Sequence, residues 1–260
     1  IQYFEKQTLI TAIKNIMSNY QFLKKGKVRD IYRDESSPDN LVFLHSDRLS
    51  SFDKHICMVN GKGNILCKTT AWWFNQTSHI IPNHMISARD NYILAKACDV
   101  IPIEFVVRGY ITGSTSTSLW THYNKGVRNY CGINFPEGLV KNQKLDAPVL
   151  TPTTKDVHDE PLSCEEIVSR GVLNQSDLDY IRGKALELFN YGSQLAHQKG
   201  LILVDTKYEF GRDKTGRIVL IDEVHTCDSS RYWKLDTYQG RFNAGQEPEK
   251  LDKDSCRDYV

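Results

Sequence analysis

The feature that most constrains this chain is a strand-like segment in which charged and uncharged residues alternate. In residues 201–210, Asp205, Lys207 and Glu209 fall on one face of a strand, because side chains alternate with a period of two. A turn bounded by glycines follows at 211–216. We therefore predict a β-hairpin that concentrates charge on one face.

The second strand of this hairpin, residues 218–224, brings a further carboxylate, Asp222. A loop of residues 211–216 would pair Phe210 with Arg217 and set Asp222 opposite Asp205. Like charges directly opposite destabilise a sheet, so the neighbouring lysine or a divalent cation must compensate. Mg²⁺ takes one or two carboxylates plus phosphate oxygens, which favours a nucleotide site. An exposed hairpin with salt bridges is the alternative.

Composition excludes several classes of protein. Lys plus Arg is 33 and Asp plus Glu is 32, and the net charge of 33 − 32 = +1 argues against a protein that binds nucleic acid through bulk charge. The seven cysteines are odd in number and form no C-x-x-C pair, so neither a disulfide scaffold nor a zinc site is expected. Without a signal-peptide pattern or a stretch of about 18 apolar residues, we expect a cytoplasmic protein with no membrane segment.

The periodicity predicts an α+β chain in two lobes with a cleft between them, divided into a β-rich lobe over 1–100 and a mixed lobe over 101–260. A capping box at Ser163-x-x-Glu166 and an apolar stripe from Leu178 to a stop near Gly200 predict helices in the second lobe. The other expected elements are a short helix over Leu9–Met17 and strands over Val28–Tyr32, Leu41–Leu44, Ile103–Ile111, Leu201–Phe210 and Ile218–Val224.

Two glycine-containing segments could hold phosphate groups. In Lys24–Tyr32, Gly26 would let backbone amides approach an anion and the lysines would supply charge. A solvated basic turn is the alternative. In Arg108–Ser118, hydroxyls and amides precede a predicted helix, with a flexible low-complexity loop as the alternative.

Two further segments are rich in polar and charged residues. Asp222–Trp233 contains Arg231 and His225, and this histidine is either an acid or base near neutral pH or simply solvated. Thr151–Glu160 has too many charges and hydroxyls for a core strand, and its proline keeps it out of a helix.

Six strings between residues 23 and 241, taken together and in order, resemble the SAICAR synthetase (phosphoribosylaminoimidazole-succinocarboxamide synthase) family. They lie at Gly26–Tyr32, Ser46–Asp53, Ile101–Ser114, Leu150–Lys155 with His158–Glu160, Leu203–Gly211 and Ile221–Arg231. The resemblance implies a two-lobed α+β fold, with an N-terminal lobe similar to that of protein kinases and an ATP cleft like that of ATP-grasp enzymes.

The resemblance also implies an activity and a site. The activity is ligation of L-aspartate to 5-amino-1-(5-phospho-D-ribosyl)imidazole-4-carboxylate with ATP and Mg²⁺, through an acyl phosphate. The partners would be these small molecules, without nucleic acid or membrane, in a monomer or homodimer. Implied catalytic residues are Lys207, Arg108 and Arg231. ATP would meet Gly26, Lys27, Arg29, Lys96, Cys98, Glu209 and Asp222. Substrate would meet Arg108, Ser114, Asp228, Ser229, Arg231, Asp53, Lys155 and Asp159, with Asp47 and Thr153 in the loops that line the same side. Metal ligands would be Glu209, Asp222 and Asp205.

The sequence leaves open one conflict about the hairpin register and two alternative classes of protein. The simple register sets Asp222 beside Asp205, whereas the resemblance pairs it with Glu209, and a bulge, a slipped register or two metals would reconcile them. A kinase-like phosphotransferase would need H-R-D and D-F-G segments, which the sequence lacks. A non-catalytic nucleotide-binding module would not need both an acidic hairpin and two arginine-containing loops.

Replacing Lys27 tests whether the Gly26 turn acts on ATP. Lys27→Ala is expected to weaken ATP binding while the free energy of unfolding stays unchanged, because an exposed lysine on a turn contributes little to stability. Titration calorimetry with ATP and urea unfolding measure the two quantities. Unchanged ATP binding would assign the segment to a solvated basic turn.

Overall fold

The computed structural model describes residues 19–51, 54–156, 159–253 and 255. Two compact units make up the chain: one contains the residues up to 72 together with 84–98, and the other contains 73–83 and the residues from 99 onward. Residues 73–83 thus group with the second unit rather than with the first hundred residues. The helix predicted over Leu9–Met17 and the predicted site residue Asp53 lie outside the described residues.

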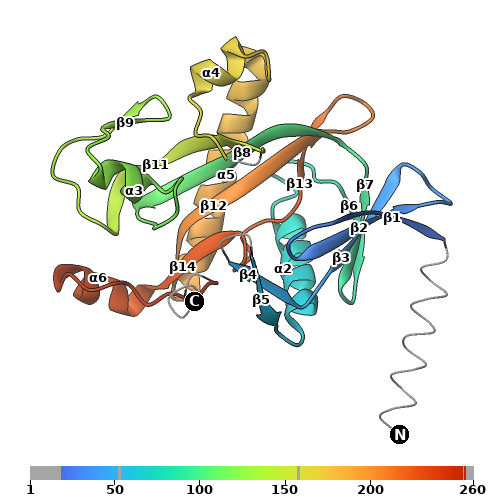
Figure 1. The fold of residues 1–260 in the computed structure, drawn as a ribbon, viewed down its shortest axis with the longest axis horizontal. Helices are drawn as coiled ribbons and strands as arrows, with labels where there is room; N and C mark the ends of the chain where they lie inside the picture. Colours follow the sequence, from blue (N-terminus) through green and yellow to red (C-terminus); the bar gives the residue numbers. More distant parts are fainter. Residues whose placement is uncertain (1–18, 52–53, 157–158, 254, 256–260) are drawn as a thin grey trace, which may run out of the picture. The chain divides into compact units, whose positions relative to one another are not determined.

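The first unit is built on a five-stranded antiparallel sheet in the order β1-β2-β3-β7-β6 (Figure 1). Its strands are β1 (Tyr20–Lys25), β2 (Arg29–Asp34), β3 (Asn40–His45), β6 (Met85–Arg89) and β7 (Tyr92–Lys96). A separate hairpin pairs β4 (Arg48–Ser51) with β5 (Lys54–Met58). The strands predicted at 28–32 and 41–44 are confirmed within two residues.

The sequence analysis missed one helix of this unit, α2 (Lys62–Gln76). Buried Cys67 packs with Ile93 and Ala95 of β7, so the helix covers the sheet. The carboxylate of Asp47 accepts hydrogen bonds from the backbone amides of Gly61 (3.2 Å) and Gly63 (2.9 Å). Asp47, predicted to lie in a substrate loop, is thus engaged in holding the start of α2.

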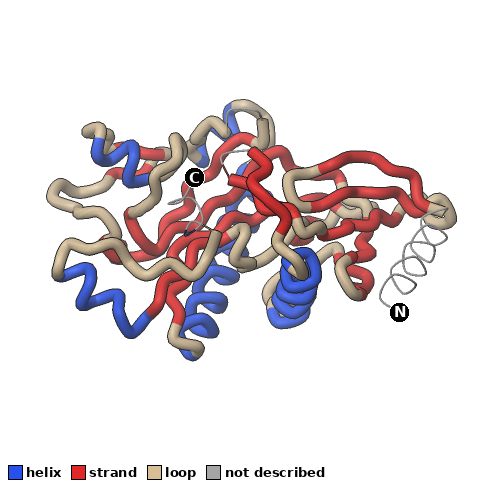
Figure 2. Tube along the Cα trace, turned by 60° about the horizontal axis from the view of Figure 1, so that its bottom comes forward, coloured by secondary structure: helices blue, strands red, loops and turns tan. Residues whose placement is uncertain are grey.

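The second unit is built on long antiparallel strands in the order β11-β8-β12-β13, with β14 also paired to β12 (Figure 1). Its strands and helices are β8 (Asp99–Ile111), α3 (Leu119–Asn124), β9 (Asn129–Tyr130), β10 (Ile133–Asn134), β11 (Gln143–Thr154), α4 (Cys164–Ser169), α5 (Gln175–Gln198), β12 (Leu201–Arg212), β13 (Ile218–Ile221), β14 (Ser230–Lys234) and α6 (Leu235–Asn243). In Figure 2, strands account for more of the described chain than helices do. The α+β class is therefore confirmed.

Helix α5 confirms the predicted amphipathic helix. It begins after Asn174, whose side-chain oxygen accepts a hydrogen bond from the amide of Asp177 at 2.9 Å, and it ends just before Gly200. The predicted capping box at Ser163 and Glu166 is present at the start of α4. The buried stripe of α5 packs against β8, β11 and β12, so this helix supports the sheet that carries the charged hairpin.

The predicted hairpin register is wrong by three residues. Phe210 pairs with Leu220 instead of Arg217, because β12 continues to Arg212 and the turn closes later. Asp213 Oδ1 accepts hydrogen bonds from the amides of Thr215 (2.9 Å) and Arg217 (3.1 Å), which fixes a tighter loop. Glu209 now pairs with Ile221, the last residue of β13, so Asp222 follows the strand and does not lie opposite Asp205.

Two polar positions predicted to avoid the core are buried. Thr151 and Thr153 belong to β11 and are 0% and 3% exposed. The Thr151 hydroxyl lies 3.3 Å from the carbonyl of Val106 on β8, within hydrogen-bond distance. A satisfied hydroxyl can be buried at little cost, which the composition of the segment alone did not indicate.

His225 is neither solvated nor an acid or base near neutral pH, contrary to both readings of the sequence. It is 1% exposed, and burial lowers its pKa to about 3, so the ring is neutral. Its Nε2 lies 2.5 Å from the hydroxyl of Tyr208, and its ring meets Trp73 edge-on at 4.5 Å between centroids. A Cβ on Gly192 of α5 would lie 2.3 Å from the imidazole, so only glycine leaves room for this ring.

Gly192→Ala is therefore expected to lower the free energy of unfolding by about 1–3 kcal/mol, since overpacking a buried site forces neighbours to shift. The matched control is Gly183→Ala on the same helix, where no atom lies within 4 Å of the added Cβ. This control should raise stability by up to about 1 kcal/mol, because alanine favours the helix. Urea unfolding compares the two variants, and equal effects would contradict the packing of His225 against α5.

Candidate active site

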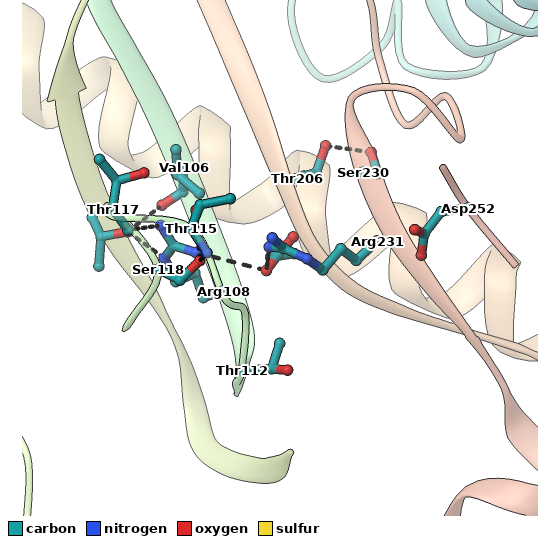
Figure 3. Close-up of polar contacts among 12 residues, drawn as sticks. Val106, Arg108, Thr112, Thr115, Thr117, Ser118, Thr206, Ser230, Arg231 and Asp252 are labelled. Carbon is teal, nitrogen blue, oxygen red and sulfur yellow. Dashed lines mark hydrogen bonds and ion pairs between the residues drawn. The ribbon is translucent and has the colours of Figure 1, made fainter. Parts of the chain in front are cut away.

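Two arginines from different strands converge on the carboxylate of Asp205. Arg231 on β14 donates from Nη1 to Asp205 Oδ2 at 2.7 Å, and Arg108 Nη1 lies 3.7 Å from the same oxygen. Strand register explains this, because Asp205 of β12 pairs with Arg108 on one side and with Arg231 on the other. In Figure 3 the two arginine side chains extend toward one another. Two positive charges and one negative charge leave this cluster at +1.

Side-chain and backbone oxygens hold Arg108 in place. Its Nε donates to the Thr151 hydroxyl at 2.8 Å and its Nη2 to the carbonyl of Thr117 at 3.0 Å (Figure 3). Arg108 is 4% exposed. A guanidinium fixed in this way keeps its orientation without the entropy loss that a free arginine suffers on binding an anion.

The loop after β8 brings hydroxyls beside these arginines. Gly113 has φ +98°, and a Cβ there would lie 2.3 Å from the Ser118 hydroxyl and 3.4 Å from Arg231 Nη2. Ser114, Gly113 and Arg231 share the wall of a cavity of about 30 Å³. The predicted grouping of Arg108, Ser114 and Arg231 is thus physically adjacent in the structure, although their roles stay predictions.

A second cluster surrounds Glu209 further along β12. Lys207 Nζ lies 2.8 Å from Glu209 Oε1 and 2.6 Å from Glu104 Oε1, and Lys155 Nζ contacts Glu209 Oε2. Glu209 is 4% exposed. Lys207 therefore compensates Glu209 and Glu104, and not the Asp205–Asp222 pair for which the sequence analysis required a cation, because that pair does not form.

Burial and neighbouring charge shift the ionisation of this cluster in opposite ways. Burial raises the pKa of Glu104, and Lys207 partly counters it. For Lys207, burial lowers the pKa, but Glu209, Glu104 and Asp222 outweigh it and leave the pKa well above its usual value. Lys207 is therefore a stable cation over the physiological pH range.

Glu209 and Asp222 both act on Lys207. Glu209 is in contact with its Nζ, and the charge of Asp222 raises its pKa, so the two carboxylates lie in one neighbourhood. No group of three or more metal-ligating side chains assembles among residues 19–51, 54–156, 159–253 and 255. Mg²⁺ needs only one or two carboxylates when a nucleotide supplies the rest, so the metal role of Glu209 and Asp222 stays a prediction that this arrangement permits. Asp205, the third predicted ligand, is engaged by two arginines, and its metal role stays a prediction.

The remaining predicted substrate residues of the second unit lie in loops. Lys253 donates to Asp228 Oδ2 at 3.1 Å, while the Ser229 hydroxyl lies 3.2 Å from that of Thr226. Asp159 has φ +47° and raises the pKa of Glu104, which places it near the Glu209 cluster.

The predicted phosphate turn of the first unit lies between β1 and β2. The Gly26 amide donates to the Arg29 carbonyl at 2.7 Å, and a Cβ on Gly26 would lie 2.7 Å from that oxygen. Glycine is therefore required for a close backbone approach, and its amide is engaged within the turn. Lys27 lies at the tip of this turn.

Arg48 braces this turn, a contact that the sequence analysis did not identify. It donates to the carbonyls of Gly26 (3.1 Å) and Lys27 (3.2 Å) and makes a two-pronged contact with Asp30 (2.7 and 3.1 Å). The geometry of the turn between β1 and β2 therefore depends on Arg48, a residue of β4.

Two further residues expected to contact ATP, Lys96 and Cys98, lie at the end of β7 and just beyond it. Lys96 is the last residue of that strand, and the Cys98 thiol lies 3.6 Å from its carbonyl. Their contact with a nucleotide stays a prediction.

Glu104, Thr151 and Arg48 are the residues of these clusters that the sequence analysis left without a role. Glu104 lies inside one of the quoted strings, but a single glutamate on a strand gives no signal of its own. Its role depends on the alignment of β8 with β12, which only the fold determines.

The fold and these clusters define an α+β protein of the class that binds small anionic ligands. A family model described as SAICAR synthetase matches residues 22–260. The chain is 57% identical over 235 residues to phosphoribosylaminoimidazole-succinocarboxamide synthase of Legionella pneumophila (strain Lens), covering 90% of this chain and 74% of that protein. The chain therefore belongs to the SAICAR synthetase family.

Solved structures agree with this assignment. SAICAR synthase from Saccharomyces cerevisiae complexed with SAICAR matches with a TM-score of 0.80 at 31% identity, covering 92% of this chain and 83% of that chain. A type-2 SAICAR synthetase in complex with ADP matches with a TM-score of 0.71 at 26% identity, covering 90% and 89%. The fold class predicted from the sequence is confirmed.

Asp205→Asn separates a structural role from a metal role. Removing the charge between Arg108 and Arg231 is expected to lower the free energy of unfolding by about 3 kcal/mol, because a buried pair is broken. The control, Glu187→Gln in the exposed pair with Lys184, should change it by less than about 1 kcal/mol. Urea unfolding measures both. Unchanged stability together with weakened Mg²⁺ binding would identify Asp205 as a metal ligand.

Proposed function

We propose that this protein joins L-aspartate to 5-amino-1-(5-phospho-D-ribosyl)imidazole-4-carboxylate with ATP, forming SAICAR, ADP and phosphate in purine biosynthesis. Family membership and 57% identity to a named synthase support the reaction. The related structures bind SAICAR and ADP, which supports a nucleotide substrate and ATP.

The observation that carries the proposal is the Arg108–Asp205–Arg231 cluster beside Ser114. Its net positive charge and fixed guanidinium groups suit a phosphate or carboxylate, and the serine hydroxyl adds a neutral hydrogen-bonding group. We assign this cluster to the anionic groups of the imidazole nucleotide. We assign Asp228, Ser229, Lys155 and Asp159 to the same substrate, as the family resemblance implies. Asp53, also expected to meet substrate, lies outside the described residues.

ATP and Mg²⁺ are assigned to the remaining predicted residues. Gly26, Lys27 and Arg29 would meet the phosphates, and Lys96 and Cys98 the adenine. Glu209 and Asp222 would hold the metal, because both carboxylates act on Lys207 and Mg²⁺ needs only one or two carboxylates when phosphate oxygens supply the rest. When bound, Mg²⁺ would neutralise phosphate charge.

A carboxylate is a poor electrophile toward an amine, so ATP must activate it. We propose transfer of the γ-phosphoryl group to the imidazole carboxylate, followed by attack of the aspartate amine and release of phosphate. The residues of this chain contribute positioning and charge neutralisation. Lys207, a stable cation, and the arginines Arg108 and Arg231 would stabilise negative charge as it moves.

The expected partners are these small molecules. No helix in the described part of the chain is long and apolar enough to cross a membrane. The absence of nucleic-acid binding, the monomeric or homodimeric state and the cytoplasmic location stay predictions.

A coupled assay of ADP release, with each component omitted in turn, tests the function. Turnover is expected only when ATP, Mg²⁺, L-aspartate and the carboxylated imidazole nucleotide are all present, because the amine drives the second step. Equal ADP release without aspartate would indicate a phosphotransferase. Nucleotide binding without any turnover would indicate a binding module.

A further inference from the structure

Both oxygens of the Glu209 carboxylate are engaged by ammonium groups. Lys207 Nζ donates to Oε1 at 2.8 Å, and Lys155 Nζ contacts Oε2. A cation that binds this carboxylate therefore meets two positive charges already in contact with it. Like charges at such distances repel strongly in a site where Glu209 is almost completely buried.

The two lysines differ in what they can do when Glu209 releases them. The Lys155 side chain is 37% exposed, so water can solvate its ammonium group. Lys207 has a second carboxylate within reach, because its Nζ lies 2.6 Å from Glu104 Oε1. Lys207 can thus leave Glu209 without losing all of its charged hydrogen bonds.

The position of Glu104 follows from the sheet. Glu104 of β8 pairs directly with Glu209 of β12, an arrangement that is unfavourable for two carboxylates unless a cation bridges them. Lys207 is that bridge. The same pairing places Glu104, a second anionic partner for Lys207, on β8 beside Glu209, the carboxylate assigned to the metal.

We propose that Glu104 is a positioning residue that retains Lys207 when Glu209 turns to the metal, so that metal binding does not leave an unpaired buried ammonium group. This inference rests on the proposed function, which assigns Mg²⁺ and ATP to Glu209 and Asp222. Glu104 acts through Lys207 and does not itself bind the metal or the substrates.

Binding of Mn²⁺ in the presence of ADP, followed by electron paramagnetic resonance, tests this role without turnover. Glu104→Gln keeps the shape of the side chain but removes its charge, so Lys207 stays on Glu209 and competes with the metal. The dissociation constant of Mn²⁺ is expected to rise about tenfold, the effect of one charged hydrogen bond. Glu104→Asp, which keeps the charge, should remain within about threefold of the wild type.

A double-mutant cycle with Lys207→Met distinguishes positioning from a direct effect of charge. In the Lys207→Met background, Glu104→Gln should leave Mn²⁺ binding unchanged, because no ammonium group remains to be held. Circular dichroism confirms that each variant is folded. If Lys207→Met does not fold, the same cycle is run with Lys207→Gln, which also removes the ammonium group but keeps a polar side chain.

Three results would overturn the inference. Wild-type affinity in Glu104→Gln would show that Lys207 needs no second partner. An equal loss in Glu104→Gln and Glu104→Asp, or the same loss with and without Lys207, would show that Glu104 does not act through the lysine. Failure of the wild-type protein to bind Mn²⁺ with ADP would instead refute the assignment of the nucleotide site itself.

Discussion

The second unit depends on one interaction: buried carboxylates on β12 pair with cationic side chains of the same unit. Asp205 and Glu209 are 5% and 4% exposed, and a buried carboxylate without partners costs several kcal/mol. Asp205 is compensated by arginines from β8 and β14, and Glu209 by lysines from β12 itself and from the segment after β11. Strands that arrive in any other register would leave these charges unpaired, so the pairing selects the register as well as stabilising it.

Strand β12 thereby carries a positively charged cluster at one point and a negatively charged cluster at another. The Asp205 cluster has a formal charge of 2 − 1 = +1. Around Glu209, four carboxylates (Glu104, Asp159, Glu209 and Asp222) and two lysines give 2 − 4 = −2. The two carboxylates of β12 lie four residues apart, roughly 13 Å along a strand. Under the proposed function, an anionic substrate and a cation would be directed to different points along β12, and this rigid strand would hold the reacting groups at a defined separation.

The sequence predicted much of this arrangement where a pattern is local. The period-two alternation of residues 201–210 assigned the charged face of β12, and the stripe of α5 assigned the supporting helix. The predicted hairpin register was wrong because it depends on the hydrogen bonds that Asp213 Oδ1 accepts from the amides of Thr215 and Arg217 within the turn, which the glycine positions did not reveal.

The sequence also did not predict which polar side chains are buried. Thr151 and His225 are polar residues in polar segments, and both lie in the core. The Thr151 hydroxyl accepts a hydrogen bond from Arg108 Nε, and His225 Nε2 lies within hydrogen-bond distance of the Tyr208 hydroxyl. Glu104 acquires its place only from the pairing of β8 with β12. Long-range pairing therefore determined each residue that sequence reasoning missed in the second unit.

The backbone that carries Asp222 is supported by the packing of His225 three residues further on. Asp222 and His225 have φ values of +69° and +51°, and non-glycine residues in this region cost about 1–3 kcal/mol each. The buried imidazole packs on Trp73 and lies within hydrogen-bond distance of Tyr208, and the His225 carbonyl accepts from the Tyr232 hydroxyl at 2.7 Å. These contacts offset that strain, and the space for the ring depends on Gly192 of α5. If Asp222 holds the metal as proposed, its backbone is therefore supported by residues that are not themselves among the proposed ligands.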